Sequence, residues 1–202
     1  MVKEGILLVI IAFLAGLGIL LLKIPYVSYI LAVLLFLMSG FFMFFFRDPH
    51  RVINAQPNEI MSPVDGTILD ILDEGDTNRI VVFLSVLNIH VARFPLSGKL
   101  EKLDYFKGTF LPAYREKASE LNERVTLTVT SEKFTYTLRL IAGIAARRIR
   151  MWVKEGDELK TGDKIAIIMF GSRAEIILPK TVKLEVKKDQ KLCGGLTLIG
   201  KN

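Results

Sequence analysis

Two long apolar runs occupy the start of the chain, and only a short interruption separates them. Residues 5–22 contain no charged side chain, and neither do residues 24–46. As a helix, each run is long enough to cross a hydrocarbon core of about 30 Å. Lys23 and Pro25 fall at the interruption, where a charge and a proline end one helix and allow the chain to reverse. The sequence therefore predicts a transmembrane helical hairpin over residues 1–46.

The charges beside these runs predict which way the hairpin faces. Lys3, Arg47 and Arg51 flank its outer ends, whereas Lys23 is the basic residue of its turn. By the positive-inside rule, both ends and the domain that follows lie on the cytoplasmic side of the cell membrane. A cleaved signal peptide is disfavoured because the apolar run resumes after the interruption. A single long re-entrant anchor is the alternative that remains open.

The remainder of the chain has the short alternating runs of a β-rich domain. We expect a polar linker over residues 47–59 and one domain over residues 60–202. β-branched and aromatic residues predict strands at 80–86, 125–130, 134–141, 165–170, 175–178 and 182–186. Residues 131–133 would turn a hairpin, and residues 113–122 alone look helical. The predicted fold class is mainly β, an antiparallel sandwich or barrel-sandwich, behind the transmembrane hairpin.

Composition narrows the possible chemistry. Lys and Arg total 27 against 21 Asp and Glu, and this net charge of +6 favours anionic partners. Nucleic acid is disfavoured because aromatic and basic residues are not interleaved as in known binding modules. One cysteine, Cys193, permits no internal disulfide, and with two histidines the chain has no metal-ligand cluster, so no metal site is predicted.

Several residues are candidates for chemistry, although each also has a plain structural explanation. Gly171 and Ser172 lie between two predicted strands, where a turn is the simpler interpretation. His90 sits among apolar neighbours, where a lone histidine is usually structural. Asp65 precedes a glycine, as turn formers do. Their order and flanking residues are more specific than any one of them.

These flanks carry a resemblance that covers nearly the whole body. The matching stretches are IMSPVDGTI, LNIHVARFPLSG, the NER of LNERV, IAGIAARRI and VKEGDELKTGDKIAIIMFGSRAEIILP. The chain resembles the phosphatidylserine decarboxylase family in its short form, which includes archaeal enzymes that act on archaetidylserine. Two departures are Arg93, where longer members carry a second histidine, and Leu140, where a glutamine is common.

The resemblance implies a self-cleaving proenzyme. In the family, the serine of the Gly-Ser pair becomes a covalent pyruvoyl cofactor, so Ser172 is the expected precursor and Gly171–Ser172 the expected cleavage site. The products would be chains of residues 1–171 and 172–202. Asp65, His90 and Ser172 match the family's Ser-His-Asp triad, with His90 as the base and Asp65 holding its tautomer. His90 is also the single histidine of the body.

The resemblance further implies a membrane-resident substrate, a phospholipid with a serine head group. The pyruvoyl group would act as the electron sink for loss of carbon dioxide, and His90 would return a proton. Arg148, Arg150 and Arg93 are the candidates for binding the phosphate, whereas strand alternation puts Arg147 on the opposite face from the first two. Ester-linked and ether-linked lipid tails are not distinguished. The oligomeric state is also open, although family members commonly form homodimers.

The alternative outside enzymes is a membrane-anchored adaptor with a lipoyl-like barrel-sandwich domain. SPVDGTI and VKEGDELKTGD suit such a hairpin-rich module. That interpretation leaves the coincidence of Asp65, His90 and Gly171–Ser172 with family motifs unexplained. A lipoylated or biotinylated carrier is disfavoured because no lysine lies between Ile168 and Ala174.

Overall fold

The computed structural model describes residues 1–22, 24, 26–109, 121–143, 149–169 and 172–202. The chain divides into two compact units, Met1–His50 and Arg51–Asn202. Most of the expected helix over residues 113–122 lies outside the described residues, as do Gly171, Arg147 and Arg148.

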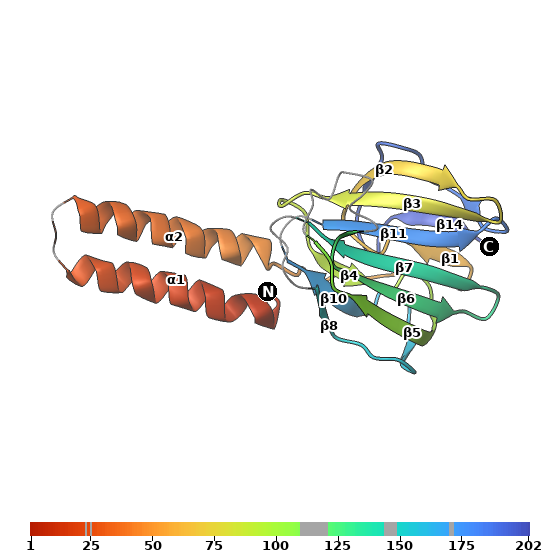
Figure 1. Ribbon diagram of the computed structural model, residues 1–202, viewed down its shortest axis with the longest axis horizontal. Coiled ribbons are helices and arrows are strands. Elements are labelled where there is room, and N and C mark those ends of the chain that lie inside the picture. The colour runs from red at the N-terminus through yellow and green to blue at the C-terminus, as the bar shows by residue number, and fades with distance from the viewer. Residues whose placement is uncertain (23, 25, 110–120, 144–148, 170–171) are drawn as a thin grey trace. The chain divides into compact units, whose positions relative to one another are not determined.

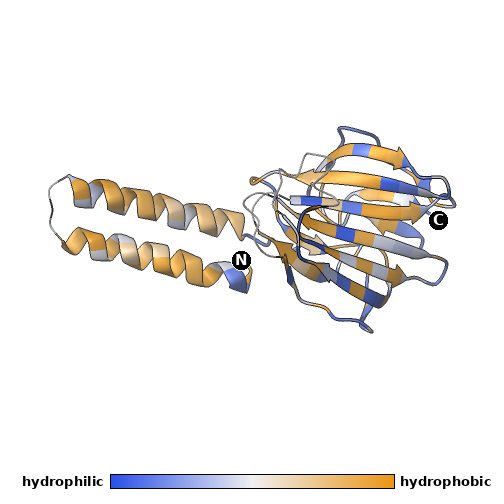
Figure 2. Cartoon of the chain, in the orientation of Figure 1, coloured by the Kyte–Doolittle hydropathy of each residue, from blue (hydrophilic) through white to orange (hydrophobic). Residues whose placement is uncertain are grey.

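In the described part of the first unit, two helices pack against each other, α1 over Lys3–Leu21 and α2 over Val27–Phe45 (Figure 1). Both are long and apolar enough to cross a membrane, and their surfaces are apolar on nearly all sides (Figure 2). Small residues let the helices approach closely. A Cβ on Gly16 would lie 2.8 Å from the Phe36 ring, and the Ser39 hydroxyl donates to the Val9 carbonyl at 3.0 Å. The two predicted apolar helices are confirmed.

The second unit is built around a curled antiparallel sheet (Figure 1). Among the described residues this sheet has eight strands, in the order β13 (Lys191–Leu192), β2 (Gly66–Asp73), β3 (Thr77–Leu84), β11 (Ser172–Pro179), β7 (Thr135–Ala142), β6 (Arg124–Thr130), β5 (Gly98–Phe106) and β9 (Glu158–Leu159). Strand β11 is central, pairing with β3 on one side and β7 on the other. The predicted mainly β fold class is confirmed.

Two smaller antiparallel sheets complete the described body. One has the order β1 (Glu59–Met61), β14 (Leu198–Lys201), β12 (Lys183–Leu184), and the other β4 (Val91–Arg93), β10 (Lys164–Ile168), β8 (Ile149–Met151). Aliphatic side chains from all three sheets form one core. Tyr136 is buried in it and donates to the Leu96 carbonyl at 2.7 Å. Burial raises the pKa of the Tyr136 hydroxyl far above its ordinary value, so the group remains a donor.

Strand ends differ from the expected ones where the site lies. The strand expected over residues 80–86 ends at Leu84, and Ser85 begins a turn. The strand expected at 175–178 begins three residues earlier, so Ser172 is the first residue of β11 rather than part of a connection. Its pairing with both neighbouring strands accounts for the difference, because a central strand gains ladder bonds on two sides.

Candidate active site

Ser172 is held at the end of the central strand. Its backbone pairs with Leu84 of β3 and Ala142 of β7, the last residue of each of those strands. Alternation along β11 puts its side chain on the same face as the core residues Ala174 and Ile176. The residue is 0% exposed, and its Oγ has no hydrogen-bond partner among the described residues. Burying a hydroxyl without a hydrogen-bond partner lowers the stability of the folded chain by about 1–3 kcal/mol. A reactive role for the hydroxyl would explain why this cost is tolerated.

His90 lies just before β4 and is also 0% exposed. Its backbone carbonyl accepts a hydrogen bond from the Ile168 N–H at 3.1 Å. Ile168 is the last residue of β10, four residues before Ser172 in the chain. The ring is oriented by a second contact, in which Nδ1 lies 3.0 Å from the Asn88 carbonyl oxygen. The first contact therefore holds the His90 backbone beside the end of β10, and the second orients its ring.

Asp65 occupies the loop between β1 and β2. Its two carboxylate oxygens accept hydrogen bonds from the two terminal nitrogens of Arg51, at 2.6 and 2.9 Å. The Gly194 N–H donates to the same carboxylate at 2.8 Å, while the Gly194 carbonyl accepts from Arg51. Both side chains of the ion pair are nearly buried, at 8% exposure for Arg51 and 11% for Asp65. This bidentate pair is the strong form of a charge-assisted hydrogen bond.

The loop that carries Asp65 is bonded to the strand that follows His90. The Pro63 carbonyl accepts from the Arg93 N–H at 2.7 Å, and Arg93 ends β4. Within the described residues, however, the hydrogen bonds of the Asp65 carboxylate go to Arg51 and Gly194 rather than to His90. The acceptor at His90 Nδ1 is the Asn88 carbonyl. In the described residues, His90 Nδ1 thus contacts a backbone group, and the tautomer-holding role expected for Asp65 stays a prediction.

Comparison with known proteins decides the family. A sequence profile described as phosphatidylserine decarboxylase matches residues 38–200. A phosphatidylserine decarboxylase proenzyme of Carboxydothermus hydrogenoformans is 40% identical over 197 residues, covering 94% of this chain and 92% of the relative. The proenzyme of the same name from Ehrlichia canis is 40% identical over 207 residues, covering 98% and 89%. The chain belongs to the phosphatidylserine decarboxylase family. It is thus an enzyme of the decarboxylase class, made as a proenzyme.

The arginines considered for this family's lipid phosphate lie in different surroundings. Arg150 lies in β8 and is exposed. Its backbone pairs with Ile167 of β10. On the other side of β10, Ile167 pairs with Val91 of β4, the residue after His90. Arg93 is buried and donates to the Gly162 carbonyl at 3.0 Å. Its guanidinium already serves a backbone group inside the fold. Of these two arginines, Arg150 is the exposed one and Arg93 the buried one.

Other residues near the site carry little sequence signal. Glu175, 0% exposed, lies on the face of β11 opposite Ser172 and pairs with Arg173 at 2.9 Å. Arg79 of β3 and Arg139 of β7 approach the same carboxylate at 3.5 and 3.6 Å. In the sequence, Arg51 stands out as a charge beside the membrane segment, not as the partner of Asp65. Asn88 acts through its main chain, which no side-chain pattern reveals.

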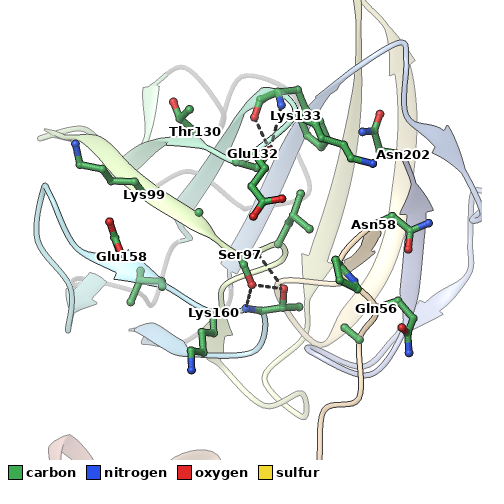
Figure 3. A pocket seen from close by; sticks show the side chains of 18 of the residues that line it. Gln56, Asn58, Ser97, Lys99, Thr130, Glu132, Lys133, Glu158, Lys160 and Asn202 are labelled. Carbon is green, nitrogen blue, oxygen red and sulfur yellow. Dashed lines mark hydrogen bonds between the residues drawn. The ribbon is translucent and has the colours of Figure 1, made fainter.

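A hollow on the described surface is a separate feature. It has a volume of about 980 Å³ and is lined partly by Lys99, Lys133 and Lys160 (Figure 3). Residues 131–134, which precede β7, form part of its wall, whereas Ser172 pairs with Ala142 at the other end of β7. Eight residues of strand correspond to about 25 Å. None of the predicted catalytic residues lines this groove.

Proposed function

We propose that this chain is a self-processing, pyruvoyl-dependent decarboxylase that converts a serine phospholipid into the corresponding ethanolamine phospholipid. The observation that carries the proposal is the buried Ser172 hydroxyl at the start of β11, which has no hydrogen-bond partner among the described residues in a chain of this family. A hydroxyl that stays protonated and unsatisfied in a core is suited to react with the adjoining peptide bond rather than to stabilise the fold.

The self-cleavage step uses residues of this chain. His90 takes the Ser172 hydroxyl proton as Oγ attacks the Gly171 carbonyl carbon, and the protonated ring then gives a proton to the Ser172 nitrogen as the peptide C–N bond breaks. The resulting ester then loses the Cα proton of residue 172 to a base, and its Cβ–Oγ bond breaks as a Cα=Cβ double bond forms. A carboxylate is left on Gly171, and the dehydroalanine hydrolyses with loss of ammonia to a pyruvoyl group. The products are chains of residues 1–171 and 172–202.

The described site fits a pyruvoyl group at position 172. The new chain end would be held by the pairing of β11 with Leu84 and Ala142, and the space occupied by the serine side chain is closed to solvent. When formed, the pyruvoyl group supplies an electron sink for breaking the bond to a carboxylate. His90 then holds the proton that replaces carbon dioxide at the substrate carbon.

Substrate binding would place the lipid phosphate near Arg150. Neighbouring strands are about 4.8 Å apart, so Arg150 and Val91, on either side of Ile167, are separated by about 10 Å. Strand alternation puts the side chains of Arg150, Ile167 and Val91 on one face of this sheet and that of the adjoining His90 on the other, so a head group bound by both Arg150 and His90 would pass the edge of the sheet. Arg148 is the second candidate, since alternation in sequence places it on the same face as Arg150.

The two apolar helices would hold this body at a bilayer, where its substrate resides. The basic residues at their outer ends favour the cytoplasmic side. The relatives described above are bacterial and are named for phosphatidylserine, which favours an ester-linked lipid over an ether-linked archaeal one. Family membership also favours the decarboxylase over a membrane-anchored adaptor.

The test is conversion of defined lipids by the purified chain in vesicles. We expect release of carbon dioxide from phosphatidylserine and formation of phosphatidylethanolamine, with no turnover by a Ser172→Ala variant. Matched vesicles that carry archaetidylserine determine which tails are accepted. A chain that splits but releases carbon dioxide from neither lipid would contradict the proposed substrate class. Turnover by Ser172→Ala would contradict the cofactor.

A further inference from the structure

A compact four-residue turn, Ser85–Asn88, connects β3 to the segment that holds His90. The Asn88 N–H donates to the Ser85 carbonyl at 2.9 Å. The Asn88 side-chain oxygen accepts from both the Ser85 N–H and the Ser85 hydroxyl, each at 2.9 Å. Side-chain oxygens of asparagine commonly close turns in this way. Three hydrogen bonds between two residues make this turn a well-defined support.

The turn lies between the two residues that we propose as nucleophile and base. It begins immediately after Leu84, which pairs with Ser172. It ends at Asn88, whose carbonyl oxygen lies 3.0 Å from His90 Nδ1. A change in the shape of the turn would therefore move the imidazole relative to β11.

The Asn88 contact also determines which ring nitrogen carries hydrogen. A backbone carbonyl only accepts, so Nδ1 must be the protonated nitrogen of the neutral ring. Nε2 is then left with a lone pair. That is the tautomer required of a base that removes the Ser172 proton.

We propose that Asn88 is a positioning residue for self-cleavage. Its side chain closes the turn, and its carbonyl fixes His90 as the Nδ1-protonated tautomer with Nε2 as the base. This inference rests on the proposed function, because it assigns a support to the base named there. It also explains how the ring is oriented while the Asp65 carboxylate is bound to Arg51 and Gly194.

The first test reads the tautomer directly. The full chain is labelled with ¹⁵N-histidine in a Ser172→Ala background, and the exposed His50 is replaced by glutamine so that His90 is the one histidine left. We expect the nitrogen chemical shifts of a neutral ring protonated at Nδ1. A neutral ring protonated at Nε2 would overturn the proposal.

The second test measures the rate of self-cleavage after synthesis of the full chain. Asn88→Ala removes the acceptor for Ser85, and we expect it to slow cleavage by at least about tenfold through misplacement of the base. Asn88→Asp keeps an acceptor oxygen at the same place and should cleave within about threefold of the natural chain. Equal rates for Asn88→Ala and the natural chain would overturn the proposal, as would equally slow cleavage of both variants.

Ser131→Ala is the matched control for the loss of a turn bond. The Ser131 hydroxyl closes a turn with Phe134 at the opposite end of β7 from Ala142, donating to the Phe134 carbonyl at 2.7 Å. This variant should cleave at the natural rate. Ser85→Ala removes one bond from the site turn and should slow cleavage about threefold, even if Asn88→Ala fails to fold. Indistinguishable rates for Ser85→Ala and Ser131→Ala would contradict the proposal.

His90→Ala separates this inference from the function on which it rests. Normal cleavage of His90→Ala would refute the assigned base and hence the proposed self-cleavage mechanism. Blocked cleavage of His90→Ala together with normal cleavage of Asn88→Ala would refute only the positioning role of Asn88.

Discussion

At the scale of single residues, the pair formed by Arg51 and Asp65 combines two nearly buried charges. Such a pair contributes little relative to an apolar substitute, but breaking it leaves one buried charge without its counterpart. Arg51 also donates to the Gly194 carbonyl, so the same guanidinium joins the Asp65 loop to the chain near the C-terminus. The pair therefore supports the loop that is bonded to β4.

Asp65→Asn should lower the free energy of unfolding by about 3 kcal/mol, because it removes the carboxylate that both Arg51 nitrogens bind. The measurement is unfolding of the full chain in detergent, in a Ser172→Ala background so that cleavage does not intervene. Glu101→Gln is the control, since its pair with Lys99 is exposed and should change stability by less than about 1 kcal/mol. Equal small effects of the two changes would contradict a structural role for the Asp65 pair.

Single residues also differ in how far sequence alone predicts them. His90 stands out because it is the body's single histidine and lies on a family motif. Arg51, the partner of Asp65, does not stand out in the sequence. It lies outside the matching stretches, and its charge is also explained by its place beside the apolar helices. The Asn88 contact with His90 uses a backbone carbonyl, which every residue has. Recognising it requires the folded geometry.

At the scale of elements, β11 combines the proposed cleavage site with a buried charge cluster. Its residues 172, 174 and 176 face the core, while Arg173 and Glu175 face the other side. The Glu175 carboxylate is approached by arginines from β3, β7 and β11 itself. The cluster thus links the same three strands whose ends meet at Ser172.

Glu175→Gln should lower the free energy of unfolding by about 3 kcal/mol, because three guanidinium groups lose the carboxylate they share. Self-cleavage should slow as well, since the pairing of β11 with β3 and β7 holds Ser172. Denaturant unfolding and a cleavage time course measure the two effects. Glu185→Gln, at an exposed pair with Lys183, is the control and should change neither. A cleavage rate unaffected by Glu175→Gln would show that the cluster does not support the site.

Elements are predictable where burial is one-sided and alternation is clear. The sequence predicts strands β6 and β7 nearly as found, because apolar residues alternate along both. It does not predict strand β5, since GKLEKLDYF mixes charges with apolar residues on a half-exposed strand. The predicted beginning of β11 is too late because Ser172 and Arg173 are polar yet buried. Their burial follows from the pairing of β11 with β3 and β7, which the local alternation of apolar and polar residues does not reveal.

At the scale of the whole molecule, Asp65, His90 and Ser172 all belong to the unit Arg51–Asn202. A chain shortened to begin at Arg47 should therefore still split between Gly171 and Ser172. Its turnover of lipid in vesicles should fall by about a hundredfold, because the helices no longer provide a high effective concentration of substrate. Turnover of a dispersed short-chain serine phospholipid should fall by less than about tenfold. Assays of both substrates with both chains measure the difference.

The control is the shortened chain returned to the bilayer by other means. A polyhistidine tag on this chain and a nickel-chelating lipid in the vesicle should restore most of the lost turnover. Equal losses on vesicle and dispersed substrates would contradict the tethering role. Failure of the shortened chain to split would show that the helices take part in folding or in the site.

The most direct measurement of the central claim is the mass of the C-terminal chain after purification. We expect a fragment of residues 172–202 that is lighter, by the mass of one ammonia molecule, than the same fragment released by simple hydrolysis, because a pyruvoyl group replaces the serine. Ser172→Ala should give one intact chain with the fold unchanged. An uncleaved natural chain, or a fragment that begins with an intact serine, would contradict the account.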